Sequence, residues 1–369
     1  MGFNCGIVGL PNVGKSTLFN AITSGRADAS NYPFCTIDPN IGIVPIPDMR
    51  LDALTEIYRP AKRVPSAIEF VDIAGLVRGA SGGEGLGNQF LSHIRDVDAI
   101  AHVVRCFDDP NVVHVDGSID PRRDVEVVEA ELIFKDLETV ERKLSEAEKR
   151  AKSGDKKSRL EAEFHGRVRA HLLGGRLARY FSLRTAEEEL WMRDCHLLTN
   201  KPVMYVCNVQ ERDVVAGGNA YVRTVRELAS SEGASVVTVS AALEAEVAQL
   251  EEGERKAFLD GLGLEESGLT KVIHEGYALL NLITFYTAGP KEVHAWTVPR
   301  GTAAPAAAGV IHSDFQKGFI RAEIIKSDDL LRLRSEAAAR EAGLIAIEGK
   351  DYLMQEGDIA HFRFNVSAG

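Results

Sequence analysis

The stretch Gly9-Leu10-Pro11-Asn12-Val13-Gly14-Lys15-Ser16-Thr17 decides how the rest of the chain is interpreted. It matches the pattern GxxxxGK(S/T), in which glycines let backbone N–H groups converge on phosphate oxygens. A hydrophobic run, Cys5 to Val8, precedes it, and a helix-compatible run, Thr17 to Ile22, follows it. This context predicts a P-loop, with residues 12–17 around the phosphates and Lys15 at the β- and γ-phosphates. A plain strand–turn–helix corner is the alternative.

Four further positions are expected around the γ-phosphate and a Mg²⁺ ion. The Ser16 hydroxyl would ligate Mg²⁺, and Asp72, which follows the apolar run Ile68 to Val71, would hold the ion through water. Gly75, three residues after Asp72, can offer its N–H to the γ-phosphate. Thr36 lies between the two motifs, where a switch loop would supply a second hydroxyl to the metal. Taken alone, Thr36 is a loop threonine.

The residue after Gly75 is Leu76, at the place where Ras-like enzymes carry the glutamine that orients the attacking water. A leucine cannot orient water. Either hydrolysis is slow, or another polar group enters the site. The glycine-rich run from Gly79 to Gly87 would form a loop able to move on nucleotide exchange, although a linker could be equally rich in glycine.

The base-recognition element should follow the strand that ends at Cys207, and there the chain has Asn-Val-Gln-Glu instead of NKxD. Glu211 is one methylene longer than the aspartate that would accept both guanine donors. Asn208 can still donate to N7 and accept from the N6 amine of adenine. This pattern favours ATP over GTP, with a GTPase of relaxed base specificity as the alternative. The residues expected near the base are Asn208, Val209, Glu211, Ser240 and Ala241.

The spacing of apolar residues changes twice along the chain, which predicts three structural parts. Residues 1–123 and 199–279 alternate short β-rich runs with helical stretches, which is typical of an α/β domain with a mostly parallel sheet. Residues 124–198 carry apolar positions at 3-4 spacing from Ala130 to Ala151, which predicts an inserted helical coiled-coil hairpin; one long surface helix is the alternative. Residues 280–369 read as a strand-rich α+β module with one helix, Asp328 to Glu341.

Composition excludes several other classes of protein. The chain has 369 residues, 45% of them hydrophobic, and a net charge of −11, which argues against indiscriminate nucleic-acid coating. No apolar run approaches the roughly 20 residues of a membrane span, and the N-terminus lacks the features of a signal peptide. The five cysteines are scattered, as expected for reduced thiols. We expect a cytoplasmic, monomeric protein without a membrane partner.

Positive charge is concentrated at the tip of the predicted hairpin. Residues 149–159 contain six basic side chains and one acid, Asp155, and residues 164–185 contain five arginines and no acid. Such a local run in an acidic protein is suited to docking on phosphates, whereas the alternative is a solvated helix face. The tip residues expected to bind RNA or the ribosome are Lys149, Arg150, Lys152, Lys156, Lys157 and Arg159.

Together these motifs resemble the Obg-like ATPase family, the YchF proteins, over essentially the whole chain. The likeness rests on GLPNVGKST at 9–17, NYPFCTIDPN at 31–40, DIAGLVRGASGGEGLGNQFL at 72–91 and NVQE at 208–211. The segments GVIHSDFQKGFIRAE at 309–323 and EGKDYLMQEGDIAHFRFNV at 348–366 resemble that family's TGS domain, a ubiquitin-like β-grasp module. The resemblance implies a P-loop ATPase with a coiled-coil arm. It also implies association with the ribosome, through the large subunit or the whole particle, and contact with rRNA by the arm and the TGS domain.

The resemblance also assigns roles to single residues. It places Mg²⁺ on Ser16 and Thr36 and adenine near Asn208, and it implies that His114 enters the site and replaces the missing glutamine. By itself, a lone loop histidine such as His114 is more often inert. Asn12 supports a further hypothesis, a K⁺ ion beside the phosphates that does part of the work of an arginine finger. An alternative to the ATPase function is a ribosome- or RNA-binding scaffold, in which bound nucleotide only sets the conformation and hydrolysis is incidental.

Overall fold

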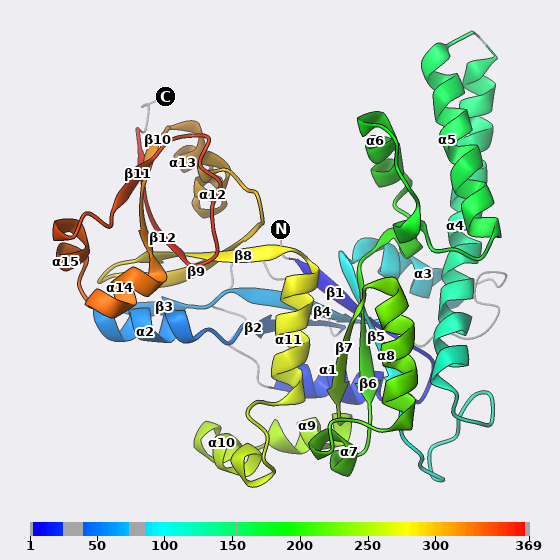
Figure 1. Ribbon diagram of the computed structural model, residues 1–369, viewed down its shortest axis with the longest axis horizontal. Helices are drawn as coiled ribbons and strands as arrows, with labels where there is room; N and C mark the ends of the chain where they lie inside the picture. The colour runs from blue at the N-terminus through cyan, green and yellow to red at the C-terminus, as the bar shows by residue number, and fades with distance from the viewer. Residues whose placement is uncertain (1–2, 25–39, 74–85, 153, 366–369) are drawn as a thin grey trace.

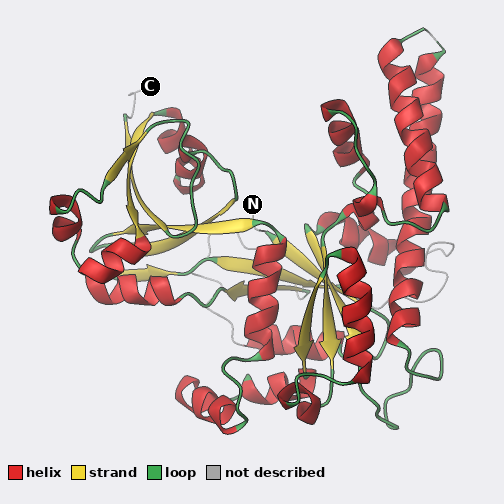
Figure 2. Ribbon diagram, viewed as in Figure 1, coloured by secondary structure: helices red, strands yellow, loops and turns green. Residues whose placement is uncertain are grey.

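A computed structural model describes residues 3–24, 40–73, 86–152 and 154–365. It contains two sheets that lie side by side and a long helical hairpin that projects from the first of them (Figure 1). Figure 2 shows helices on both sides of the first sheet and around the edges of the second. Within the described residues, no helix combines the length and the apolar character needed to cross a membrane.

The first sheet has six strands in the order β2-β4-β1-β5-β6-β7. Every neighbouring pair is parallel except β2 with β4, which is antiparallel at the edge. The order matches the α/β prediction, because helical crossovers connect the parallel strands. The strands are β1 (Asn4–Val8), β2 (Ile41–Pro45), β4 (Ala67–Asp72), β5 (Ala99–Arg105), β6 (Val203–Asn208) and β7 (Ser235–Val239).

Alternating side chains on the central strands explain why helices cover both faces of this sheet. On β6, Met204 and Val206 belong to the main apolar core, whereas Tyr205 and Cys207 face a second core with Val222 of α8. Both faces are therefore apolar, as expected for a buried parallel sheet. The helices of this domain are α1 (Lys15–Ser24), α3 (Leu86–Asp96), α7 (Glu211–Val215), α8 (Ala220–Glu232), α9 (Ala241–Val247), α10 (Glu252–Gly261) and α11 (Gly268–Leu279).

The inserted segment forms a hairpin of α4 (Pro121–Ala151) and α5 (Lys156–Leu173), followed by the shorter α6 (Ala186–Cys195). Val140 of the predicted seam belongs to a buried cluster with Phe164 of α5, whereas Ala130 is exposed. The apolar seam therefore starts later along α4 than its spacing suggested. The middle of α4 is also held by Asp136, which accepts the backbone N–H groups of residues 198 and 199 at 2.7 and 2.8 Å.

The second sheet has the order β11-β10-β12-β8-β9-β3 and packs on α12. Its core contains Phe285, Phe319 and Phe362 with three small alanines of α12, which let the helix lie close to the sheet. The elements are β8 (Leu282–Ala288), β9 (Glu292–Pro299), α12 (Ala304–Ile311), α13 (Ser313–Lys317), β10 (Phe319–Lys326), α14 (Ser327–Leu333), α15 (Glu336–Glu341), β11 (Ala346–Glu348) and β12 (Asp358–Phe364).

Two features of this module differ from the sequence prediction. The single helix expected over 328–341 is wrong: the chain forms α14 and α15, because Arg334 ends α14 in the left-handed region (φ 52°) and Ser335 caps α15. Moreover, β3 (Lys62–Val64), from the first third of the chain, pairs in parallel with β9. The preceding helix α2 (Met49–Tyr58) packs on the same sheet, so the division at residue 280 leaves out part of the module.

Candidate nucleotide site

The loop from Gly9 to Gly14 lies at the carboxyl end of β1 and leads into α1. Gly9 (φ 156°), Asn12 (φ 61°) and Gly14 (φ 98°) have positive φ values, a conformation that glycine and asparagine tolerate best. A Cβ atom on Gly14 would lie 2.3 Å from Nδ2 of Asn208, so this glycine is required for space as well as conformation. The loop therefore has the backbone conformation that the glycines of the motif were expected to permit.

Lys15 begins α1 and is largely buried. Its Nζ donates to the Leu10 carbonyl oxygen at 2.7 Å, within the loop itself. Burial lowers the pKa of Lys15 to about 8, and the charge of Asp72 only partly opposes that shift. The site therefore contains a poorly solvated ammonium group that would gain from an incoming anion.

Ser16 and Asp72 meet where the predicted Mg²⁺ ligands should be. Because β4 pairs with β1, Asp72 lies beside Ile7, and its Oδ2 accepts the Ser16 hydroxyl at 3.3 Å. Its other oxygen, Oδ1, is buried and has no partner within the described residues. A hydroxyl, a carboxylate and an unpartnered carboxylate oxygen fit the oxygen ligands that Mg²⁺ prefers. The predicted residues Thr36 and Gly75, like Leu76, lie outside the described residues.

Asn208 ends β6 and joins three segments of the site. Its Nδ2 donates to the Val13 carbonyl at 2.9 Å, and its Oδ1 accepts the Ala241 N–H at 3.0 Å. Its side chain is buried, so the amide holds the P-loop against the loop that precedes α9. Of the other predicted base-site residues, Val209 is buried, Ser240 caps α9, and Glu211 is exposed at the start of α7.

His114 lies in the loop between β5 and α4, next to the P-loop: Asn12 donates its Nδ2 hydrogen to the Val113 carbonyl at 3.1 Å. The imidazole is buried, with Nε2 2.8 Å from Oδ2 of Asp124. Sequence reasoning missed two residues that organise this loop. One is Asp124, and the other is Arg105, whose guanidinium donates to three carbonyls between residues 107 and 112. The only signal for Arg105 in the sequence is an arginine at the end of a largely apolar run.

The six predicted tip residues of the arm are all exposed around the turn between α4 and α5, with Arg150 paired to Glu161 at 2.7 Å. The arginines further along do not form a free basic run. Arg167 pairs with Glu188, Arg169 with Glu141, and Arg179 with two glutamates. The acids come from segments distant in sequence, so the positive character is concentrated at the tip.

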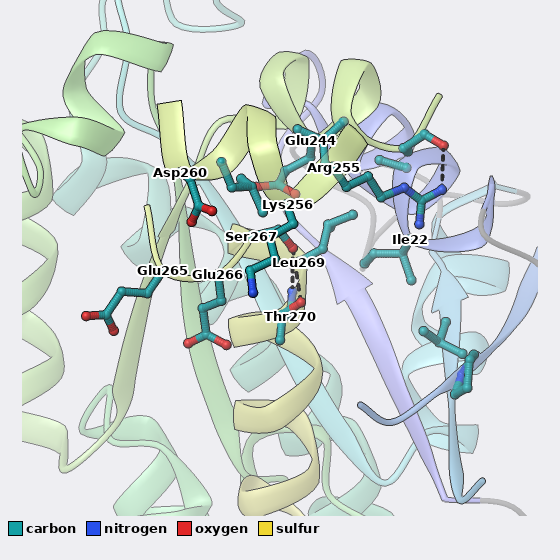
Figure 3. Close-up of a pocket in the computed structure, with 16 residues that line it drawn as sticks. Ile22, Glu244, Arg255, Lys256, Asp260, Glu265, Glu266, Ser267, Leu269 and Thr270 are labelled. Carbon is teal, nitrogen blue, oxygen red and sulfur yellow. Dashed lines mark hydrogen bonds between the residues drawn. The ribbon is translucent and has the colours of Figure 1, made fainter. Parts of the chain in front are cut away.

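A separate pocket of about 400 Å³ lies at the other end of α1, lined by Ile22 and by residues of α9, α10 and α11 (Figure 3). Glu244 is buried beside it, and its Oε1 accepts the Gly268 N–H at 2.7 Å. This carboxylate therefore supports the start of α11. The P-loop lies at the amino-terminal end of α1, whereas the pocket adjoins the last turn of that helix. The pocket is therefore distinct from the nucleotide site.

Comparison with known families agrees with this architecture. Residues 4–148 match the family of 50S ribosome-binding GTPases. Residues 282–365 match the carboxyl-terminal family of YchF GTPases, described as a protein of unknown function (DUF933). Among solved structures, the YchF GTPase of Schizosaccharomyces pombe superimposes with a TM-score of 0.89 at 41% identity, over 98% of both chains.

Full-length relatives are more similar still. The ribosome-binding ATPase YchF of Haemophilus ducreyi is 55% identical over 366 residues, which cover 99% of this chain and all of the relative. The proteins of the same name from Escherichia coli O157:H7 and Bacillus subtilis are each 52% identical, again over 99% of this chain and all of the relative. With its P-loop, its projecting helical arm and its carboxyl-terminal sheet, the chain belongs to the YchF family of P-loop nucleoside triphosphatases.

Proposed function

We propose that this protein is a Mg²⁺-dependent ATPase that hydrolyses ATP to ADP and phosphate and associates with the ribosome. The observation that carries the proposal is the meeting of Lys15, Ser16 and Asp72 at the end of the glycine-containing loop, where Oδ1 of Asp72 has no partner among the residues that the structure describes. The names of the full-length relatives, ribosome-binding ATPases, support the choice of nucleotide and partner.

The residues divide the work of hydrolysis among them. Lys15 would leave the Leu10 carbonyl and pair with the β- and γ-phosphates. Ser16 and Thr36 would ligate Mg²⁺ and Asp72 would hold it through water; when bound, the ion neutralises charge on the phosphate oxygens. The backbone N–H of Gly75 would contact the γ-phosphate. Water attacks the γ-phosphorus, and the bond to the β–γ bridging oxygen breaks to release ADP.

His114 is the proposed substitute for the absent glutamine. It is the histidine of the loop that contacts the P-loop through Asn12 and Val113. Its ring is hydrogen-bonded to Asp124, so positioning a water requires this hydrogen bond to break. The proposal predicts that His114→Ala lowers kcat by more than it changes the KM for ATP.

Within the 208–211 segment, the proposed adenine preference rests on Glu211 and not on Asn208. Asn208 is already committed to Val13 and Ala241, and Glu211 is exposed on a short helix, without the aspartate that would accept both guanine donors. A GTPase of relaxed specificity is the second candidate, favoured by the name of the S. pombe relative, a YchF GTPase. Competition between ATP and GTP for a fluorescent ATP analogue decides between them: equal displacement by the two nucleotides contradicts adenine preference.

The arm tip is the proposed ribosome contact, and the carboxyl-terminal module, which resembles a TGS domain, is a second. We expect the triple substitution of Lys149, Lys156 and Lys157 by alanine to weaken ribosome binding and to flatten its salt dependence, with basal hydrolysis in the absence of ribosomes unchanged. The matched control removes three exposed bases of the nucleotide domain, Arg223, Lys256 and Lys271. Equal binding by both variants would refute the assignment.

The scaffold alternative predicts that nucleotide turnover is dispensable. Lys15→Ala should disable the phosphate site while leaving the arm unchanged, because the Lys15 ammonium donates to the loop in which it lies. If cells that carry this variant behave as wild type, hydrolysis is incidental. If they behave as cells that lack the protein, turnover is required.

A further inference from the structure

Both ring nitrogens of His114 are engaged in the structure. The Asp116 N–H donates to Nδ1 at 3.1 Å, and because a backbone N–H can only donate, Nδ1 carries no hydrogen. The ring hydrogen is therefore on Nε2, which donates to Oδ2 of Asp124 at 2.8 Å. Neither nitrogen is available to hold a water molecule in this arrangement.

Asp124 is well placed to keep the ring in this state. Its carboxylate is buried, and its second oxygen, Oδ1, accepts from Arg123 at 3.0 Å. Arg123 also lies 3.7 Å from Asp116 and donates to the Ser118 carbonyl. His114, Asp116 and Asp124 lie close enough together to hold a metal ion, but the guanidinium of Arg123 already supplies positive charge to both carboxylates. We call His114, Asp116, Arg123 and Asp124 the histidine latch.

The latch is attached directly to the arm. Asp124 lies in the first turn of α4, and the same continuous helix reaches the basic tip at Ala151. Between these points the helix packs on the nucleotide domain through buried Val125, Val128 and Leu132, and two polar contacts lie on either side of Leu132. Glu129 pairs with Arg179 at 3.2 Å, and Asp136 accepts the backbone N–H groups of residues 198 and 199. Asp124 and the tip thus lie on opposite sides of one pivot.

The dimensions of α4 make the latch sensitive to the tip. With the pivot near Leu132, midway between the two polar contacts, Asp124 is about 12 Å from it and the tip about 28 Å, at 1.5 Å per residue. If α4 moves as a rigid rod, a displacement of about 5 Å at the tip moves Asp124 by about 2 Å. A hydrogen bond of 2.8 Å does not survive such a shift.

We propose that the histidine latch restrains hydrolysis and that docking of the arm tip releases it. This inference rests on the proposed function, because it assigns regulation to the same site. While His114 is bonded to Asp124 and Asp116, it cannot position water. Tilting of α4 withdraws Asp124 and frees the Nε2 side of the ring for the nucleotide site.

The test is the ATP turnover of Asp124→Ala and Asp124→Asn without ribosomes. A latch predicts that basal kcat rises roughly tenfold, the factor by which losing one charge-assisted hydrogen bond shifts a two-state equilibrium. Glu126→Ala is the matched control, since it removes an exposed carboxylate from the same turn without touching His114, and its rate should equal wild type. If folded Asp124 variants turn over at or below the wild-type rate, Asp124 orients a working histidine and the latch is refuted.

Two further measurements separate the latch from the proposed function. In the double variant His114→Ala/Asp124→Ala, the gain in kcat should disappear; a gain that persists overturns the proposal. Nitrogen-15 NMR of the His114 ring in the nucleotide-free protein should show an Nε2-bound hydrogen that exchanges slowly with water, because Asp124 accepts it, and in the Asp124 variants this hydrogen should exchange faster. If no variant hydrolyses ATP, the proposed function fails, and an NMR spectrum unchanged in Asp124→Ala then overturns the latch on its own.

Discussion

Asn208 is a sharp test of how the nucleotide site is built, because its two buried hydrogen bonds join the P-loop to the loop before α9. In Asn208→Ala, the Val13 carbonyl and the Ala241 N–H both lose their partner in a buried place. Each orphaned group costs about 1–3 kcal/mol, so the free energy of unfolding of the nucleotide domain should fall by about 2–6 kcal/mol.

The same loss should weaken nucleotide binding without changing base preference. Since Asn208 holds the loops that surround the nucleotide, we expect the affinities for ATP and GTP to fall by similar factors, at least roughly tenfold for about 1.4 kcal/mol of lost preorganisation. Urea denaturation and titration calorimetry measure the two effects. Asn208→Asp still accepts from Ala241 but turns a buried carboxylate oxygen toward the Val13 carbonyl, so it should lose no less stability than Asn208→Ala.

The outcome that would contradict this reasoning is a loss of affinity for ATP but not for GTP. If Asn208→Ala loses affinity for ATP alone while its unfolding free energy is unchanged, the side chain reads the base directly. The two bonds seen in the structure would then be those of a nucleotide-free arrangement only.

Three other predictions concern the P-loop. The pKa of Lys15 is lowered to about 8, and bound phosphates would raise it. ATP binding at pH 8 should therefore take up about half a proton, and the affinity for ATP should fall as the pH rises above 8. Calorimetry in buffers of different ionisation enthalpy measures the proton uptake. Gly14→Ala places a Cβ 2.3 Å from Nδ2 of Asn208 at φ 98°, so ATP affinity should drop at least roughly tenfold in a filter-binding assay. If Asn12 seats a monovalent cation, turnover should be faster in K⁺ than in Na⁺ at matched ionic strength, and equal rates would remove that role.

The parts of the fold that the sequence predicted are those determined by local pattern. β5 and β7 have the predicted bounds, because each is an apolar run between turn residues. The P-loop was predictable from its motif, because the glycines of this motif permit the backbone conformation that phosphate binding requires. The proximity of Ser16 and Asp72 was also predictable, since the carboxyl ends of adjacent parallel strands meet at one edge of a sheet.

The parts that were missed depend on contacts between distant residues. β3 is three residues long and pairs with β9, more than 200 positions later, so nothing in its own sequence marks it as a strand. The arginines after residue 164 seemed unpaired because their acids, Glu129, Glu141 and Glu232 among them, come from other helices. Asp124 was not singled out because a carboxylate in a first helical turn is usually only a favourable charge.

The placement of α2 and β3 has a consequence for how this protein can be divided. Leu51 and Leu54 fill the core beneath the second sheet, Arg50 pairs with Glu356, and Tyr286 donates to Asp48 at 2.6 Å. A fragment that begins at residue 280 would expose that core and leave β9 as an unprotected edge. Residues 280–369 are therefore not a complete folding unit. Exchanging this module between relatives requires residues 48–64 to be exchanged with it.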